Sequence, residues 1–454
     1  MTTDINILDK ILKARENRAF LRKNISEKNV ISISLSLNIP GYPKSNELIT
    51  SFFEQILSEL EIYLYSNRIC VENSEKIIDE AGNFWISAIN TNNISEFEIK
   101  LLTEKFEENH NVGRIIDVDI TNVKCENVSS GKAKKCIICD LPAIVCMRNN
   151  NHSNIIIRNI IFDLITNYLS EIRKEKIIHR ITEIAIKSLL YEVSLTPKPG
   201  LVDFEKNGSH NDMDYFTFLN STAALSPYFS ELAKKGFDFK DDFKNALPVI
   251  RNIGLQMESA MFKATNGVNT QKGLIFLLGL SIFSAANIYS NYHKIDYRIF
   301  EETIKKICFK LFENELNNSS NFQTHGEISF KKFGKIAGGA RLEAELGFPT
   351  VFNFGLPVFE NELKKVNKIK KENINFALQK TLISIISENN DTNILFRKDE
   401  KVLENLKSIA KKVLNEKIKY SELEKFCKSE NISPGGSADL LAITVFIYFV
   451  KDVL

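Results

Sequence analysis

The sequence lacks a hydrophobic run long enough to cross a membrane. Its two longest apolar stretches, Gly273–Ala286 and Ala438–Val450, fall short of the roughly eighteen residues that a transmembrane helix needs. The first residues, MTTDINILDKILKARENRAF, also lack the apolar core of a secretory signal. We therefore expect a soluble, cytoplasmic protein with no membrane partner.

An excess of charge of one sign is also missing. The chain has 59 Lys and Arg residues against 57 Asp and Glu residues, which gives a formal net charge of +2 at pH 7. A nearly neutral chain has no overall field that attracts polyanions. Charge therefore gives no support to a nucleic-acid partner.

Cysteines are few, and linkers between domains are not evident. Seven cysteines in 454 residues are an odd number without the density of a disulfide scaffold, which indicates reduced thiols or a local metal site. We find no Pro/Gly-rich linker, internal repeat or long low-complexity tract. At about 150 residues per domain, the length predicts two or three domains with sizeable cores.

The pattern of apolar residues changes along the chain. Alternating or β-branched runs at Val30–Ile39 and Arg114–Val123 predict strands, and Asn46–Leu64 has the periodicity of a helix. From about Asn154 onward, nearly every long segment has apolar residues at three- and four-residue spacing, which predicts helices.

The change between the two patterns falls near the charged stretch IRKEKIIHR, at residues 172–180. The sequence therefore predicts two domains, with an α+β domain at residues 1–173 and an all-α domain at residues 174–454.

Two carboxylates stand out in the first half. Asp117 and Asp119 are two residues apart on a predicted strand and therefore project from the same face. Together they offer oxygen ligands for Mg²⁺, the cation that nucleotidyl-type transfer uses to neutralise phosphates and orient a departing pyrophosphate. The alternative is an ordinary solvated strand face.

A cluster of cysteines follows. Cys136, Cys139, Cys146 and His152 have a spacing that suits a zinc site fastening a loop. The alternative is a set of ordinary buried cysteines. Arg148 lies between the last two of these residues and favours phosphate binding instead.

Three segments of the first half carry a family resemblance: NIPGYPK (38–44), GRIIDVDI (113–120) and KCIICDLPAIVCMRNNNH (135–152). They are similar to the citrate lyase holo-acyl-carrier-protein synthases, over about residues 7–169. The resemblance implies a nucleotidyltransferase-type domain. It also implies transfer of phosphoribosyl-dephospho-coenzyme A from its triphosphate precursor to a serine of the citrate lyase acyl carrier protein (gamma subunit), with release of pyrophosphate. Asp117 and Asp119 are then metal candidates.

The candidates for substrate and phosphate binding in this half are basic: Arg15, Arg18, Lys44, Arg114 and Arg148. Arg15 and Arg18 have the spacing of neighbours on one helix face, although such a pair also suits surface ion pairs. Residues 121–134 are rich in lysine where the family leads us to expect arginine, which argues against bidentate phosphate contacts there.

Four stretches of the second half combine glycine, proline and carboxylates: EVSLTPKPGLVD (192–203), GSHNDMD (208–214), GVNTQKG (267–273) and SPGGSADLLA (433–442). Glycine and proline are disfavoured inside helices, so this density indicates backbone that approaches a ligand. We interpret the stretches as parts of one phosphate-handling pocket of an enzyme.

With THGE (324–327) and GGARLEAELGFP (338–349), these motifs resemble the triphosphoribosyl-dephospho-coenzyme A synthases, from about Lys176 to the C-terminus. The resemblance implies an all-helical fold. It also implies displacement of adenine from ATP by the ribose 2′-hydroxyl of dephospho-coenzyme A.

Attack at a ribose anomeric carbon passes through a cationic sugar, which carboxylates stabilise. The catalytic candidates in this half are Glu192, Asp203, His210, Asp212, Asp214 and His325. Asp212 and Asp214 are also the candidate Mg²⁺ ligands of this half, and each could instead cap the helix that follows. The two histidines are candidates for proton handling, with a structural hydrogen-bonding role as the alternative.

The candidates for phosphate and ribose binding in this half are Lys198, Asn269, Lys272, Arg341, Ser433, Gly435, Gly436 and Ser437. Lys198 lies in a rigid Pro-Lys-Pro-Gly turn, although the turn alone would explain the prolines. The glycines lead into an apolar helix whose N-terminus would attract an anion. Ser437 could instead be only an N-cap, with Asp439 adding favourable charge to the first turn.

Two positions depart from the family pattern. Gln271 stands where the family normally has histidine, and Lys398 stands where we expect glycine after Arg397. Asp391 and Arg397, in DTNILFRKD, are therefore secondary candidates, and a plain connecting loop explains that stretch equally well.

Together these patterns predict a bifunctional enzyme that makes the citrate lyase prosthetic group and attaches it to the carrier protein. Its substrates are ATP and dephospho-coenzyme A, and its expected metals are Mg²⁺ and, at the cysteines, Zn²⁺. One alternative is the equivalent cofactor synthase for malonate decarboxylase. The other is a non-catalytic protein that binds or regulates the carrier.

Overall fold

The structure is a computed structural model that describes residues 2–90, 94–312, 332–365 and 371–454. The chain divides into two compact units, residues 1–173 and 174–454. The division falls inside one continuous helix, α5 (Asn154–Ser194). The charged stretch at residues 172–180 is therefore part of a helix, and not a break between two helices.

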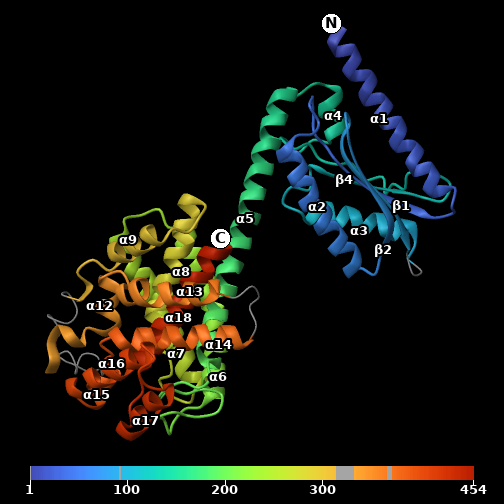
Figure 1. Ribbon diagram of the computed structural model, residues 1–454. Coiled ribbons are helices and arrows are strands. Elements are labelled where there is room, and N and C mark those ends of the chain that lie inside the picture. Colours follow the sequence, from blue (N-terminus) through green and yellow to red (C-terminus); the bar gives the residue numbers. More distant parts are fainter. Residues whose placement is uncertain (1, 91–93, 313–331, 366–370) are drawn as a thin grey trace. The chain divides into compact units, whose positions relative to one another are not determined.

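The first unit is built on a four-stranded antiparallel sheet with the order β2-β3-β1-β4 (Figure 1). Its strands are β1 (Ile31–Leu37), β2 (Cys70–Asp79), β3 (Gly82–Asn90) and β4 (Ile116–Thr121). In β1 the sequence ISISLSL alternates, so that Ile33 and Leu35 face the buried core while the serines face the other side. β4 alternates in the same way and lies at an edge.

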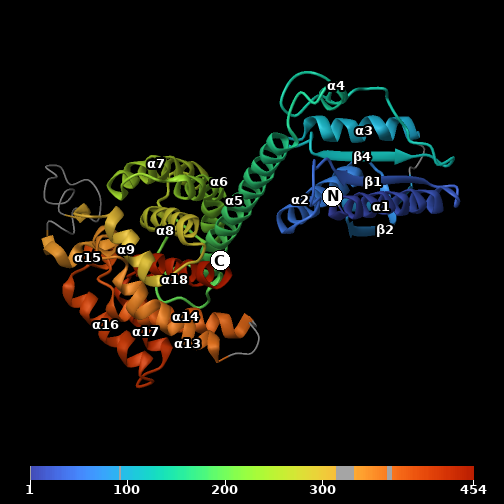
Figure 2. The same cartoon turned by 90° about the horizontal axis from the view of Figure 1, so that it is seen from above.

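Helices cover both faces of this sheet. Helices α2 (Glu47–Ser66) and α3 (Glu96–Asn109) contribute apolar side chains to the core under one face. Asn46 caps α2, and Ser95 forms a capping box with Glu98 at the start of α3. Helix α1 (Thr2–Ser26) lies on the opposite side of the sheet from α2, and α3 runs alongside β4 (Figures 1 and 2). The unit is α+β, as the sequence predicts.

Within the described residues, the second unit consists of helices and loops. Its longer helices after α5 are α6 (Tyr215–Asp238), α7 (Ala246–Ala264), α8 (Lys272–Tyr292), α9 (Tyr297–Ile307), α14 (Lys371–Glu388), α16 (Glu400–Leu414), α17 (Tyr420–Glu430) and α18 (Gly435–Val453). The shorter ones are η1 (Phe243–Asn245), η2 (Gly334–Ala337), α12 (Gly339–Glu345), η3 (Val351–Gly355), α13 (Leu356–Lys364) and α15 (Thr392–Arg397). The predicted all-helical character of this half agrees with the structure.

Helices α8 and α18 form the centre of this unit. Both are apolar on nearly every side, which is typical of helices buried within a large core. Figure 2 shows α8 between α7 and α18. The apolar run at Gly273–Ala286 is too short for a membrane span, but α8 extends beyond it and as a whole has the length and composition to cross a membrane. However, 78% of its most apolar window is buried inside the unit. Its hydrophobicity is accounted for by packing against neighbouring helices.

Candidate functional sites

A cavity of about 320 Å³ lies in the second unit. Its lining includes residues from every glycine- and carboxylate-rich motif of the described C-terminal half: 192–203, 208–214, 267–273, 338–349, 391–397 and 433–442. Segments almost 250 residues apart in the sequence therefore meet at one site. The predicted candidates among the lining residues are Glu192, Lys198, His210, Asp212, Asn269, Lys272, Ser433, Gly435 and Gly436, together with the secondary candidates Asp391 and Arg397.

The N-termini of the two central helices point into this cavity. Lys272 and Gly273 open α8, Gly435 and Gly436 open α18, and all four residues line the cavity. Partial positive charge at a helix N-terminus favours anions. The glycines let these helix ends lie close to other groups, since a Cβ at Gly435 would lie 2.8 Å from Asn393 Nδ2 and would displace that side chain. The arrangement suits a polyanionic ligand.

A second cavity of about 470 Å³ adjoins the first. The two share Lys272, Gly273, Gly339, Ala340 and Thr392 as lining residues, and Arg341 lines the second cavity. The predicted candidate Arg341 thus lies one cavity away from the main group of motifs. Two neighbouring cavities offer room for two ligands that meet at the shared wall.

Lys198 and Glu192 form a buried ion pair in the cavity wall. Lys198 Nζ lies 2.6 Å from Glu192 Oε1 and also donates to the Glu192 carbonyl at 2.9 Å. The Asp203 carboxylate accepts from the backbone N–H of Lys198 at 2.9 Å and from two further amides of its own turn. Asp203 is buried and is not among the lining residues, so it holds the turn that presents Lys198.

His210 is poised between two other candidates. Its Nε2 lies 2.9 Å from Ser433 Oγ, and its Nδ1 lies 3.8 Å from Asp212 Oδ1. Burial, followed by the positive charge of Arg397, lowers the pKa of His210 below its ordinary value. The imidazole is therefore neutral near pH 7 and able to accept a proton.

Asp391 joins two motifs of the cavity wall. Its carboxylate accepts from the backbone N–H of Ser437 at 2.9 Å, from Ser437 Oγ at 3.2 Å and from the backbone N–H of Asn393 at 3.0 Å. Asn389 donates to Ser437 Oγ at 3.0 Å. The predicted candidate Ser437 thus lies behind the wall, where it links Asp391 to the start of α18.

Two further acids line the cavity. Burial, followed by the negative charges of Glu192 and Asp391, raises the pKa of Asp439 well above its ordinary value. Burial raises the pKa of Glu343 to about 7, although its carboxylate accepts hydrogen bonds from the backbone N–H and the hydroxyl of Thr350. Raised pKa values of this kind are common at sites that move protons or bind cations.

Gln271 presents a buried amide group to the cavity. Thr270 Oγ1 donates to Ser221 Oγ at 2.9 Å, and Ser221 Oγ donates to Gln271 Oε1 at 2.6 Å. This chain orients the amide, and Gln271 Nε2 is buried with no partner among the described residues. A buried donor without a partner costs free energy unless a ligand accepts from it.

The remaining candidates of this half have local roles or lie elsewhere. Asp214 caps α6 by accepting from the backbone N–H and hydroxyl of Thr217, and it is not a lining residue. Asn269 accepts from the backbone N–H of Lys272, whose Nζ pairs with Glu258 at 2.8 Å. His325 lies outside the described residues.

Sequence reasoning missed Glu343 and Asn389 and gave Asp439 only a helix-end role. Asp439 follows the glycines of the SPGGSAD motif, and this position next to a glycine turn is the sequence feature that indicates a place in the site. Glu343 stands in a run, RLEAELG, in which helical spacing makes any of three charged residues equally suitable for the surface.

In the first unit, Asp117 and Asp119 lie on the same face of β4, opposite Ser36 and Ser34 of β1. Lys134 Nζ lies 2.6 Å from Asp117 Oδ1, and Arg22 lies 3.6 Å from Asp119. Burial, followed by the negative charge of Asp117, raises the pKa of Asp119. The two carboxylates are thus close enough to influence each other and are flanked by basic groups.

The basic candidates of this unit separate into different surroundings. Arg18 is buried, donates to Asp79 and to the Gly82 carbonyl, and stacks on Phe84. These contacts make Arg18 a structural link between α1 and the sheet. Arg114 Nε is buried and has no partner among the described residues. Arg148 is exposed at the end of α4 (Ala143–Arg148).

Lys44 and Arg15 lie in one cationic cluster with Arg158, which sequence reasoning missed. Burial, followed by the positive charges of Arg15 and Arg158, lowers the pKa of Lys44. Arg158 donates to the carbonyls of Pro40 and Pro43, and Lys44 Nζ donates to the Ile39 carbonyl at 2.6 Å. Carbonyl groups of the NIPGYPK motif therefore hold the basic side chains of this cluster in place.

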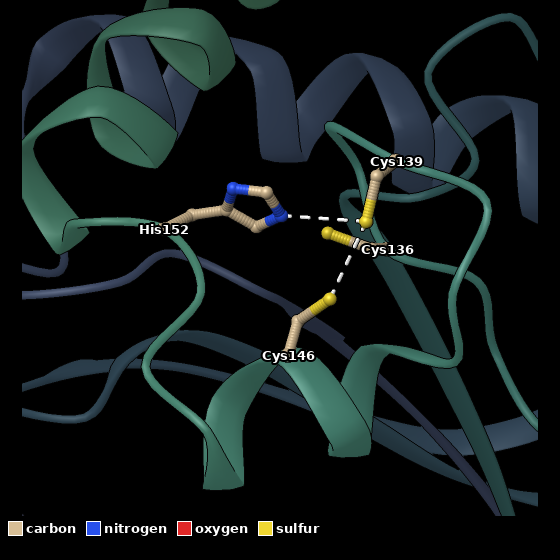
Figure 3. Close-up of side chains that lie close together, drawn as sticks. All are labelled: Cys136, Cys139, Cys146 and His152. Atoms are coloured by element: carbon tan, nitrogen blue, oxygen red, sulfur yellow. Dashed lines mark hydrogen bonds between the residues drawn. The ribbon is translucent and has the colours of Figure 1, made fainter.

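The side chains of Cys136, Cys139, Cys146 and His152 point toward a common centre (Figure 3). Cys139 Sγ lies 3.4 Å from Cys146 Sγ and 3.3 Å from His152 Nε2. None of the seven cysteines, all of which lie in the described ranges, forms a disulfide. The spacing in the sequence thus brings together the four residues that it singled out.

Known proteins resemble the chain over almost its whole length. The profile of the family CitX, apo-citrate lyase phosphoribosyl-dephospho-CoA transferase, matches residues 6–168. The profile of the family CitG, ATP:dephospho-CoA triphosphoribosyl transferase, matches residues 178–453.

Individual relatives agree with one or both of these profiles. Protein CitXG of Leuconostoc mesenteroides subsp. cremoris is 32% identical over 97% of this chain and 96% of its own length. Protein CitXG of Haemophilus influenzae is 29% identical over 97% of this chain and 95% of its own. The 2-(5''-triphosphoribosyl)-3'-dephosphocoenzyme-A synthase of Pectobacterium atrosepticum is 35% identical over 62% of this chain and 92% of its own. The chain therefore belongs to the CitXG family, in which a CitX transferase domain is fused to a CitG domain, and is an enzyme of citrate lyase prosthetic-group biosynthesis and attachment.

Proposed function

We propose that the C-terminal cavity binds ATP and dephospho-coenzyme A and joins them. In this reaction the ribose 2′-hydroxyl of dephospho-coenzyme A attacks the anomeric carbon of the ATP ribose. The bond to adenine breaks, adenine leaves, and the triphosphate stays on the transferred ribose. The observation that carries this proposal is the meeting of the α8 and α18 N-termini at a cavity whose walls also hold acids.

The ends of these two helices suit the triphosphate. Backbone N–H groups and the positive ends of the helix dipoles favour phosphate oxygens. Lys272, which pairs with Glu258 at 2.8 Å, adds a positive charge at the start of α8. Asp212 and Asp439 offer the carboxylate oxygens that Mg²⁺ prefers. Bound Mg²⁺ would neutralise triphosphate charge. Because Asp214 is engaged in capping α6, we assign the magnesium role to Asp212 and Asp439 in its place.

Two groups of shifted pKa suit the proton transfers. His210 is neutral near pH 7 and accepts the proton of the 2′-hydroxyl as the new C–O bond forms. Glu343, with a pKa of about 7, supplies a proton to the departing adenine. A raised pKa makes a carboxylic acid a proton donor near pH 7, and a lowered pKa makes an imidazole a proton acceptor.

The adjoining cavity suits the rest of dephospho-coenzyme A. Its lining combines apolar residues such as Leu255 and Phe276 with Arg251 and Arg341. Such a lining accommodates a long arm of alternating aliphatic and amide groups that ends in phosphates. The shared wall then brings the two substrates together.

For the first unit we infer a nucleotidyltransferase-type domain that uses Asp117 and Asp119 with Mg²⁺. It transfers the phosphoribosyl-dephospho-coenzyme A unit to a serine of the citrate lyase acyl carrier protein and releases pyrophosphate. The Arg15–Lys44–Arg158 cluster supports binding of the substrate phosphates. Fusion of the two domains raises the effective concentration of the intermediate near its consumer. We place this work in the cytoplasm.

Mass spectrometry tests both halves at once. The purified full chain is incubated with ATP, Mg²⁺, dephospho-coenzyme A and apo-citrate-lyase carrier protein, while adenine and carrier mass are followed. Adenine together with a heavier carrier is the expected result. Adenine without the adduct would overturn the transfer assignment or its carrier, and malonate decarboxylase carrier protein in a parallel reaction separates these two outcomes. Neither product, even with pre-made intermediate, would indicate a carrier-binding protein without catalysis.

A further inference from the structure

We propose that Cys136, Cys139, Cys146 and His152 hold one Zn²⁺ ion in a closed tetrahedral site that fastens the chain between β4 and α5. The proposal does not depend on the function assigned to either cavity. The four ligand atoms lie within 4.8 Å of one another. In a zinc site with Zn–S near 2.3 Å and Zn–N near 2.0 Å, ligand atoms are about 3.5–3.8 Å apart. The contacts of 3.4 Å and 3.3 Å made by Cys139 Sγ are close to that spacing.

The backbone around these residues is arranged to support thiolates. The N–H of Ile138 donates to Cys136 Sγ at 3.4 Å, inside the short Cys-x-x-Cys turn. The Asn151 side-chain amide lies 3.7 Å from Cys146 Sγ, and the backbone N–H of Asn151 donates to the Cys146 carbonyl. Donors directed at sulfur stabilise metal-bound thiolates and fix the ligand orientation.

This segment has little apolar core of its own. Helix α4 has six residues, of which Cys146 is the buried one. Its neighbours Ile144 and Met147 are 52% and 73% exposed, and Leu141 in the preceding turn is 47% exposed. A segment that buries so little apolar surface needs another source of stability, and a structural metal supplies it.

The cluster also sits at the base of a hairpin that reaches the carboxylates of β4. The backbone N–H of Ala143 donates to the Lys134 carbonyl at 2.8 Å, and the N–H of Cys136 donates to the Leu141 carbonyl at 2.8 Å. Lys134 Nζ contacts Asp117 and Glu107. Zinc would therefore hold Lys134, and through it Asp117, in position without touching substrate. With four protein ligands the ion has no open coordination position, which is typical of structural and not catalytic zinc.

Metal content and cobalt spectroscopy of the full chain test this site. Protein made in zinc-supplemented medium and purified with a phosphine reductant is expected to contain one zinc per chain. Replacement by Co²⁺ is expected to give intense visible d–d bands and thiolate charge-transfer bands, the signature of a tetrahedral thiolate-rich site. The variants Cys139→Ser and His152→Ala should lose the zinc or change the cobalt spectrum. Cys125→Ser removes an exposed cysteine outside the cluster and should leave both unchanged.

Activity gives a second readout. Removal of zinc from the wild-type chain with a chelator should reduce carrier modification at least tenfold while adenine release persists, because the two activities lie in different units. The proposal is overturned if wild-type protein takes up neither zinc nor Co²⁺, or if both cluster variants keep an unchanged metal spectrum. It is also overturned if Cys139 and Cys146 form a disulfide in protein that was purified with the phosphine reductant. The wild-type cobalt spectrum decides the question even if the variants fail to fold.

Discussion

The carboxylate of Asp439 lies directly against the backbone of Gly273. A Cβ added at position 273 would come within 2.6 Å of Asp439 Oδ2. Gly273 is in the first turn of α8 and Asp439 in the second turn of α18. This contact therefore limits how closely the N-terminal turns of α8 and α18 approach each other beside the cavity.

The substitution Gly273→Ala should lower adenine release by about 100-fold, because the new methyl group displaces the Asp439 carboxylate and misplaces its ligand. Thermal stability should fall little, since alanine favours helices more than glycine does. Steady-state rates with ATP and dephospho-coenzyme A, together with a thermal melt, check this. Gly254→Ala in α7, where the nearest contact to a new Cβ is 3.9 Å, serves as the control for stability alone, because Gly254 lines the second cavity. Wild-type rates in the Gly273 variant would contradict the role of Asp439.

Substitution of His210 tests the assigned base. His210→Ala should lower kcat/KM for adenine release by roughly 100-fold to 10,000-fold. In the wild type the acid limb of the pH profile should lie below pH 6.5, because burial and then Arg397 lower the pKa of His210 from the ordinary value of 6.5.

Arg397→Gln should move that acid limb to higher pH, because loss of the positive charge raises the pKa of His210. A matched variant, Lys398→Gln, removes a charge from the neighbouring residue, which pairs with Glu430. Lys398 is not among the groups that shift the pKa of His210, so this variant should leave the limb in place. An acid limb that stays unchanged in Arg397→Gln would rule out His210 as the titrating base.

Glu343 predicts a specific dependence of stability on pH. Its pKa is about 7 in the folded chain and near 4.5 in the unfolded chain, so the folded state binds the proton more tightly. Between these values the free energy of unfolding should fall as pH rises, because the unfolded state gives up the proton first. Below about pH 4.5 this contribution is fully present, and above about pH 7 it is lost.

Glu343→Gln should flatten this slope while keeping the hydrogen bonds to Thr350 in part. Thermal melts of the two proteins across pH 5–8 check the prediction, with Glu360→Gln as a control acid outside the cavity lining. An identical slope in wild type and Glu343→Gln would contradict the assignment.

Gln271 should contribute more to substrate binding than to the stability of the fold. Its Nε2 is buried without a partner in the described part of the chain. We propose that a substrate oxygen accepts a hydrogen bond from this atom. Gln271→Leu should change the melting temperature little, because it removes a buried unsatisfied donor but also removes the Oε1 atom that accepts from the Ser221 hydroxyl. The same change should raise the KM for one substrate about tenfold or more. Gln256→Leu, on the exposed side of α7, is the control, and an unchanged KM at position 271 would show that the amide does not contact substrate.

The composition of the C-terminal cavity follows closely from the sequence motifs, because glycines, prolines and carboxylates gathered in several loops of a helical domain indicate backbone that approaches a ligand. What the motifs do not reveal is the direction of each side chain. Asp212 and Asp214 are two residues apart, yet Asp212 lines the cavity while Asp214 caps α6. Capping and ligand binding use the same residue types at the same helix ends, so local sequence cannot separate them.

Other features of the sites depend on contacts between residues far apart in the sequence, which local motifs do not reveal. The spacing of Arg15 and Arg18 gives no sign that Arg18 meets Asp79, 61 residues later, or that Arg15 lies near Arg158. The cysteine cluster was recoverable because ligand spacing within one short segment is itself a local signal. Asp439 was assigned only to a helix end because its neighbours Glu192 and Asp391 come from distant parts of the chain.

The hydrogen bonds of Asp391 link two parts of the cavity wall. One carboxylate bridges the turn at Asn393 and the first turn of the last helix at Ser437. A chain shortened before Ser437 would lose this link together with the side of the cavity that α18 forms. The loop at Asn393 would then keep only its local contacts, so the damage would extend to a wall that the shortened chain still contains.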